Sequence, residues 1–152
     1  MNYIRVVLSA LLTLHSQHSA AFEPPKAAEL QRIADQLRVR LDILERVEVT
    51  LVENNPLVLS VETKGGRSGP FVIKVDEAFI DTLTAGEVEA ALAHELGHVW
   101  IYTHHPYLQT EKLANDIALR VVSRSTLEPV YEKVWKRTGI KGNLAEFIAQ
   151  EP

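Results

Sequence analysis

The sequence predicts an α+β fold in which a small antiparallel three-stranded sheet packs on one long helix, with further helices flanking it. Apolar residues recur at helical spacing near the start of the chain, alternate in the middle, and return to helical spacing over the C-terminal half. The 152 residues, 46% hydrophobic and 24% charged, have the size and balance of one globular domain. We expect that domain to span residues 22–152.

The first 21 residues have the pattern of a secretory signal peptide. Arg5 precedes the apolar run Val6 to Leu14, and small residues follow at 19–21. The apolar run is only about half of the roughly 20 residues that a membrane-spanning helix needs. We therefore expect cleavage after Ala21, a mature protein without a transmembrane segment, and export to the periplasm or the medium.

Charge and cysteine content exclude several classes of function. The net charge is -4, whereas binding of nucleic acid requires a clustered basic surface, so no nucleic-acid partner is expected. The sequence contains no cysteine, which excludes a disulfide framework and a lipid-modified cysteine.

The first half of the chain predicts one helix and three strands. A helical period of apolar residues predicts an amphipathic helix through Leu30, Ile33, Ala34, Leu37, Leu41 and Leu44. Three apolar segments with strand-like patterns then follow, at 47–51, 57–61 and 71–75. Asn54, Asn55 and Pro56 separate the first two segments, and a glycine-rich stretch separates the last two. These turn residues favour hairpins, and hence antiparallel pairing of successive strands.

The second half predicts helices. Thr84 and Glu87 have the spacing of a capping box, so a long helix is expected from Ala85 to about Tyr102. The other helices are expected over 76–83, from Thr110 through Val122, from a cap formed by Ser125 and Glu128 to an end at Gly139, and within 143–150.

His94, Glu95 and His98 form the pattern His-Glu-x-x-His inside the long helix. Residues four apart on a helix lie on one face, so both imidazoles can reach one Zn2+ ion. Glu95 can take a proton from a zinc-bound water and pass it to the leaving amine, which makes peptide hydrolysis the expected reaction. Gly97 lies in the helix interior at a cost of about 1 kcal/mol relative to alanine, so we expect its missing side chain to serve a purpose.

A catalytic zinc ion takes three protein ligands and keeps one position open, so the third ligand must lie outside this pattern. We predict Glu111, which opens the next helix. Asn115 lies one turn further along the same face, where it can orient a ligating imidazole as a second-shell residue. Asp116 is the alternate for that role.

Several other residues compete for roles at this site. His104 and His105 are the alternate third ligands, provided that the chain reverses at Pro106. A hydroxyl that stabilises the oxyanion could come from any of three tyrosines, among which the sequence does not choose: Tyr102, Tyr107 and Tyr131.

The stretch from Gly69 to Val122 resembles the gluzincin metallopeptidases of the HtpX and CAAX prenyl protease type. The similarity lies in Pro70–Ile73, in Leu83–Val99 and, more weakly, in Glu111-x-x-Ala114. It implies a zincin-like fold, the zinc ligands His94, His98 and Glu111, and Glu95 as catalytic acid and base. It also implies that the strand near Phe71 to Val75 is the sheet edge on which an extended peptide substrate pairs.

The chain departs from that family at two points. Asn115 stands where those enzymes commonly have aspartate, and Glu111 follows His98 much sooner than their third ligand does. The form Glu-x-x-Ala-Asn-x-x-Ala from Glu111 is also similar to the repressor-cleaving ImmA/IrrE group, which a signal peptide suits poorly.

The sequence therefore predicts a zinc-dependent endopeptidase acting in the cell envelope or outside the cell. Because the domain is small, a partner protein could complete its substrate cleft. The alternative is an exported zinc-binding interaction or assembly protein with a structural or catalytically silent zinc site, closed by His104 or His105 as a fourth ligand.

Overall fold

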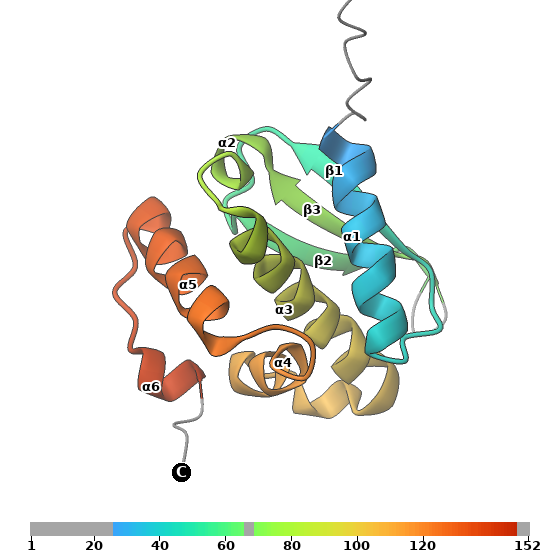
Figure 1. Cartoon of the computed structure of the whole chain (residues 1–152). Helices are drawn as coiled ribbons and strands as arrows, with labels where there is room; N and C mark the ends of the chain where they lie inside the picture. The colour runs from blue at the N-terminus through green and yellow to red at the C-terminus, as the bar shows by residue number, and fades with distance from the viewer. Residues whose placement is uncertain (1–25, 66–68, 149–152) are drawn as a thin grey trace, which may run out of the picture.

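A computed structural model describes residues 26–65 and 69–148 (Figure 1). The expected signal peptide at 1–21 lies outside these residues. None of the helices in the described ranges is both long and apolar enough to span a bilayer. In chain order the elements are α1 (Lys26–Arg40), β1 (Val47–Val52), β2 (Leu59–Thr63), β3 (Phe71–Asp76), α2 (Glu77–Ile80), α3 (Ala85–His104), η2 (Pro106–Leu108), α4 (Glu111–Ala118), α5 (Arg124–Thr138) and α6 (Leu144–Phe147).

The sheet is mixed, so the expectation of an antiparallel sheet is wrong for one of its two pairings. Its strand order is β1-β3-β2. β2 and β3 form the expected antiparallel hairpin, with Val61 opposite Ile73. β1 instead pairs with β3 in parallel, with Val49 opposite Ile73. β3 is therefore the central strand, and β1 and β2 lie at opposite edges.

The link between β1 and β2 crosses the end of β3 instead of closing a hairpin. The backbone N–H of Asn55 donates to the Asp76 carboxylate at 3.0 Å, and its side-chain amide donates to the Lys74 carbonyl at 3.1 Å. The N–H of Asp76 donates to the carbonyl of Val58 at 2.8 Å. Asn54 and Val58 reverse the chain with positive φ values of 55° and 67°. The turn residues at 54–56 are thus anchored on β3.

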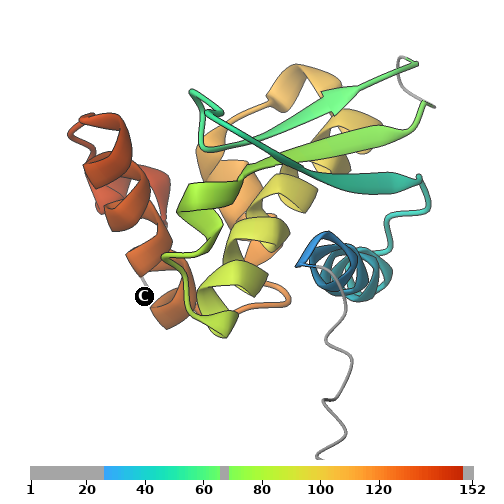
Figure 2. The ribbon, with the colours of Figure 1, turned by 90° about the horizontal axis from the view of Figure 1, so that it is seen from above.

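α1 and α3 pack side by side on one face of the sheet (Figures 1 and 2). α1 buries Leu30, Ala34 and Leu37 against the core, as its apolar period predicts. It ends at Arg40, and Asp42 has a positive φ of 55°, which the right-handed helix cannot accommodate. Leu44 is consequently 90% exposed and does not continue the buried stripe.

The capping box that predicts the start of α3 is present. The Thr84 hydroxyl accepts from the Glu87 N–H, and the Glu87 carboxylate accepts from the Thr84 N–H at 2.7 Å. Lys133 of α5 donates to the same carboxylate at 2.6 Å, which ties α5 to the first turn of α3. Glu87 therefore both caps the start of α3 and links it to α5.

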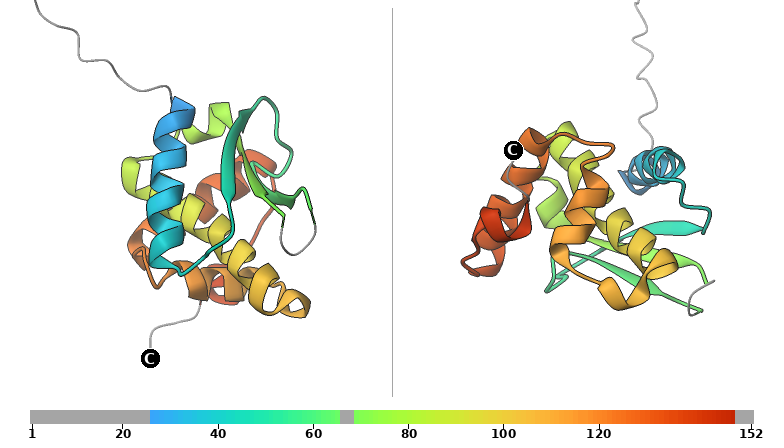
Figure 3. Two further views of the ribbon diagram at one scale, coloured as in Figure 1. Left: turned by 90° about the vertical axis from the view of Figure 1, so that its right-hand side faces the viewer. Right: turned by 90° about the horizontal axis from the view of Figure 1, so that it is seen from below.

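α5 and α6 lie on the side of α3 away from α1, and α4 packs across α3 (Figure 3). α5 begins after Ser123, two residues before the expected cap at Ser125. Ser123 has the extended backbone of a cap, but its hydroxyl lies close to those of Ser125 and Thr126, so the local sequence offers several cap candidates. Gly139 ends α5 in the left-handed conformation, as predicted, with φ of 73°.

Candidate metal centre

Gly97 brings α4 onto α3 beside the two histidines. A Cβ atom at this position would overlap the carbonyl oxygen of Ala114 and lie 3.0 Å from its Cα atom. The missing side chain lets the two helices approach closely. Glu111 lies one turn before Ala114 on α4, so this contact places its carboxylate over His94 and His98. The purpose expected for Gly97 is therefore confirmed.

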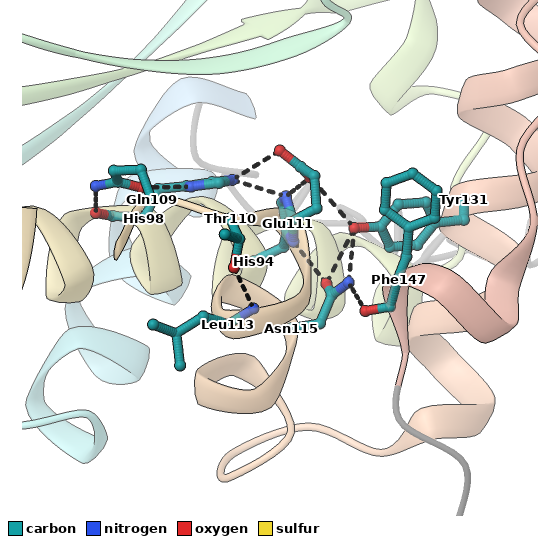
Figure 4. A network of polar contacts seen from close by, with 9 residues as sticks. All are labelled: His94, His98, Gln109, Thr110, Glu111, Leu113, Asn115, Tyr131 and Phe147. Carbon is teal, nitrogen blue, oxygen red and sulfur yellow. Dashed lines mark hydrogen bonds and ion pairs between the residues drawn. The ribbon is translucent and has the colours of Figure 1, made fainter. Parts of the chain in front are cut away.

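His94, His98 and Glu111 converge as the sequence predicts (Figure 4). His94 Nε2 lies 3.2 Å from one carboxylate oxygen of Glu111, and His98 Nε2 lies 3.4 Å from the other. The two Nε2 atoms are 3.2 Å apart. Facing nitrogen lone pairs and a carboxylate repel one another unless a cation or proton lies between them, so the group fits a metal ion. Two imidazoles and one carboxylate are also the ligand set of many catalytic zinc sites.

Asn115 lies behind His94, where the sequence predicts it. Its Oδ1 is 2.7 Å from His94 Nδ1, and the residue is fully buried. The alternate residue, Asp116, instead pairs with Lys112 at 3.0 Å and is not in contact with either imidazole in the described structure. Asn115 is thus the hydrogen-bonded partner of His94, and Asp116 lies on the partly exposed face of α4.

Gln109 is a contact of His98 that sequence reasoning missed. Its Oε1 lies 3.0 Å from His98 Nδ1, and its Nε2 donates to the His98 carbonyl at 3.0 Å. Because that carbonyl only accepts, the amide must turn its oxygen toward Nδ1, which then carries the proton. In the neutral imidazole, His98 Nε2 is then left with its lone pair toward Glu111. The one available signal was a polar residue directly before the α4 cap, Thr110.

We expect Gln109→Ala to weaken zinc binding about 10- to 100-fold, because loss of an outer-shell partner leaves the ligating imidazole unoriented. The measurement is a competition titration with a chromophoric chelator. Gln36→Ala on the exposed face of α1 is the matched control and should leave the affinity unchanged. Equal affinities for Gln109→Ala and wild type would show that Gln109 does not orient His98.

Glu95 is a buried carboxyl beside the histidines, with 6% exposure. Burial raises the pKa of Glu95; His94 and His98 act in the opposite direction, and the charge of Glu111 raises it further. A carboxyl whose pKa lies nearer neutrality is a better proton acceptor and donor at physiological pH. Its environment therefore suits a general base and acid.

The metal-ligand candidates have coupled charges. Hydrogen bonds to His94 and His98 hold the pKa of Glu111 far below its ordinary value, despite partial burial. Burial lowers the pKa of His98, but hydrogen bonds to Glu111 and Gln109 outweigh it, and the net pKa is raised. Without metal, the Glu111 carboxylate therefore favours the protonated form of His98.

This coupling predicts opposite pH trends for stability and metal affinity. The raised pKa of His98 contributes stability that is fully present below pH 6.5, its ordinary value, and is lost as the pH rises through the folded-state pKa. The lowered pKa of Glu111 contributes stability that is present above pH 4.5 and is lost as the pH falls further. Metal affinity should instead fall with decreasing pH, because zinc displaces the proton of His98.

Thermal unfolding of chelator-treated wild type and His98→Ala between pH 6 and 8.5 tests this prediction. The Tm difference in favour of wild type should shrink as the pH rises. A difference that grows with pH would contradict the assigned direction of the His98 shift.

The competing ligands lie elsewhere. His104 stacks on Trp100 with ring centroids 4.2 Å apart, and His105 lies beyond it at the end of α3; both are exposed. Neither belongs to the group formed by His94, His98 and Glu111 in the described ranges. The structure therefore does not bring His104 or His105 to the position of a third ligand.

The three tyrosines have different positions. Tyr107 is 91% exposed and is not among the residues lining the cavity. Tyr102 lines the cavity and packs edge-on against Phe71, with ring centroids 5.6 Å apart. The Tyr131 hydroxyl lies 3.1 Å from Asn115 Oδ1 and 3.4 Å from Glu111 Oε2. Burial raises the pKa of Tyr131, so its hydroxyl keeps its proton.

A cavity of about 510 Å3 opens over the site. Its polar wall holds His94, Glu95, His98 and Glu111. β2 lines another side with Leu59 and Val61 among its apolar residues, and α5 adds Leu127, Val130 and Val134. β2 is an edge strand, whereas β3 is central, so the expectation that Phe71 to Val75 forms the substrate-pairing edge is wrong.

No known protein family matches the sequence, and no curated protein is detectably similar to it. Among solved structures, the chain resembles the crystal structure of the metallopeptidase zymogen abylysin of Pyrococcus abyssi, with a TM-score of 0.54 and 16% sequence identity. The similarity covers 75% of this chain and 99% of the other. The chain therefore shares the overall fold of a metallopeptidase zymogen.

Proposed function

We propose that this protein is a zinc-dependent endopeptidase of the gluzincin type. The observation that carries the proposal is the convergence of His94, His98 and Glu111 at one side of a cavity whose wall also holds the buried Glu95. The shared fold with a metallopeptidase zymogen supports it. The resemblance to the HtpX and CAAX prenyl protease type supplies the finer assignment.

His94, His98 and Glu111 would hold the zinc ion. When bound, zinc polarises the scissile carbonyl and lowers the pKa of a water molecule to about 7. Glu95 accepts the proton of the attacking water and delivers it to the leaving amine, as its raised pKa favours. Asn115 and Gln109 keep the two imidazoles in the orientation that faces the ion.

The proposed substrate is a peptide that lies extended along β2. β2 is an edge strand and lines the same cavity as Glu95, so a strand added to it would lie beside this carboxyl. Apolar side chains of β2 and α5 surround the remaining space, which favours substrates with apolar residues beside the scissile bond. The proposal that the protein is exported rests on the signal-peptide pattern of residues 1–21. We also propose that a partner protein extends the substrate cleft of this small domain.

Zinc content and peptide hydrolysis together test the proposal. Purified protein should bind about one zinc ion per chain and cleave fluorogenic peptides with apolar residues at the cleavage site. Glu111→Ala should lose the metal and the activity, whereas His104→Ala, an exposed histidine outside the group, should retain both. Zinc binding without cleavage, together with metal loss in His104→Ala, would establish the structural zinc site of the alternative function instead.

A further inference from the structure

We propose that the C-terminal segment Asn143–Ile148 positions one of the ligands of the metal centre, His94. The backbone carbonyl of Phe147 fixes the amide of Asn115, and this amide determines which ring nitrogen of His94 carries the proton. Phe147 is then a positioning residue that acts on a metal ligand without touching it. The inference rests on the metal site of the proposed function, but it does not require that the protein cleave peptides.

The contacts of the Asn115 amide fix which way it faces (Figure 4). Asn115 Nδ2 donates to the Phe147 carbonyl at 2.8 Å. A carbonyl oxygen accepts hydrogen bonds and cannot donate, so only the NH2 group of Asn115 can face it. Oδ1 must therefore face His94 Nδ1, which lies 2.7 Å away and carries the proton. In the neutral imidazole, His94 Nε2 is then left with its lone pair toward Glu111, as metal binding requires.

The Tyr131 hydroxyl cannot set this direction by itself. It accepts from Asn115 Nδ2 at 2.8 Å and lies 3.1 Å from Oδ1. A hydroxyl both donates and accepts, so it would satisfy either orientation of the amide. The Phe147 carbonyl is the contact that distinguishes the two orientations.

Side-chain packing holds that carbonyl in place. The Phe147 ring lies 5.6 Å from the Tyr131 ring and 5.9 Å from the Trp135 ring, measured between centroids. Ile148 next to it is fully buried, and Asn143 caps the short helix by accepting from the Ala145 N–H at 3.1 Å. The segment is thus docked by apolar contacts on α5, while its one polar contact with Asn115 reaches the metal centre.

The two imidazoles differ in this respect. Gln109, which orients His98, is itself fixed by the carbonyl of His98, so that arrangement is local. Asn115 depends on a carbonyl 32 residues further along the chain. If the segment separates from α5, the amide can turn and present Nδ2 to His94. The ring proton would then move to Nε2, which faces the metal position, and zinc affinity would fall.

The test uses full-length variants and two measurements, zinc affinity and the proton position on His94. The second comes from 15N chemical shifts of the ring nitrogens in metal-free protein at pH 8.5. Wild type should carry the His94 proton on Nδ1. Phe147→Ala, which removes the ring that docks the carbonyl, should populate the Nε2–H form and weaken zinc binding about 10- to 100-fold. Phe147→Leu, which keeps an apolar side chain, should remain close to wild type.

The decisive control is Phe147→Ala combined with Asn115→Asp. A carboxylate presents an acceptor to His94 in either direction and no longer donates to the Phe147 carbonyl, so Phe147→Ala should then cause no further loss of zinc affinity. Ile33→Ala, a partly buried core position on α1, controls for general loss of stability and should leave the affinity unchanged.

Three results would overturn the proposal: a proton on His94 Nε2 in wild type, equal losses from Phe147→Ala with and without Asn115→Asp, or an equal loss in Ile33→Ala. If Phe147→Ala does not fold, the wild-type spectrum still decides, because a His94 proton on Nε2 would refute the assigned direction of the Asn115 amide. None of these measurements uses peptide cleavage, so a protein that binds zinc and cleaves nothing would refute the proposed function alone.

Discussion

Glu95→Gln is expected to lower kcat for peptide hydrolysis by about 10²- to 10⁴-fold while the protein keeps its zinc ion, because the amide cannot accept the proton of the attacking water. The substitution preserves the shape of a side chain that is only 6% exposed, so the surrounding core should not change. The measurements are steady-state hydrolysis and bound metal in the same preparation.

Glu89→Gln is the matched control for this experiment. Glu89 is exposed on the same helix, six residues before Glu95, and is not among the residues that line the cavity. Its replacement should leave activity and metal content unchanged. Loss of zinc in Glu95→Gln would mean that Glu95 is a ligand, and retained activity would mean that another group moves the proton.

Gly97→Ala is expected to separate α3 from α4. The added methyl group would overlap the Ala114 carbonyl oxygen, and this backbone atom cannot move without the rest of α4. Overpacking of this kind costs about 1–3 kcal/mol, against a gain of about 1 kcal/mol in helix propensity. Because α4 carries Glu111, we also expect zinc affinity to fall by at least about tenfold.

Urea unfolding of the metal-free protein and a zinc titration measure the two effects of Gly97→Ala. Gly86→Ala is the control within the same helix, since its Cβ atom would meet only the Thr126 side chain, at 3.1 Å, which can shift. It should leave zinc affinity unchanged. A Gly97→Ala protein with wild-type affinity would show that Glu111 does not depend on this close helix contact.

The parts of the site that the sequence predicts are those encoded by short spacings. Thr84 and Glu87 are three residues apart in a capping box, and His94 and His98 lie four apart on the helix that it starts. Glu111 and Asn115 follow the same rule on α4. In each case one turn of helix converts a sequence interval into a shared face, which local physics fixes before tertiary structure is known.

The remaining features depend on contacts that no local pattern records. The residue type of Gln109 does not reveal that it bonds to the backbone of His98, and a backbone carbonyl such as that of Phe147 has no residue-type signal at all. The turn at 54–56 contains residues typical of hairpins, but its Asn55 N–H bonds to Asp76, at the end of β3 and 21 residues further along the chain. The turn residues predict that the chain reverses, but they do not predict which strand the following segment pairs with.

The strand order also sets a sequence of events in folding. Within residues 26–65 and 69–148, β1 and β2 pair only with β3, which follows both of them in the chain. As the chain leaves the ribosome, neither edge strand has a hydrogen-bonded neighbour until Asp76 has emerged. Pairing β1 with β3 in parallel also requires closure of a loop that contains all of β2, and non-local contacts of this kind slow folding. We therefore expect sheet formation to be a late and cooperative step, with α3 supplying the surface on which the three strands assemble.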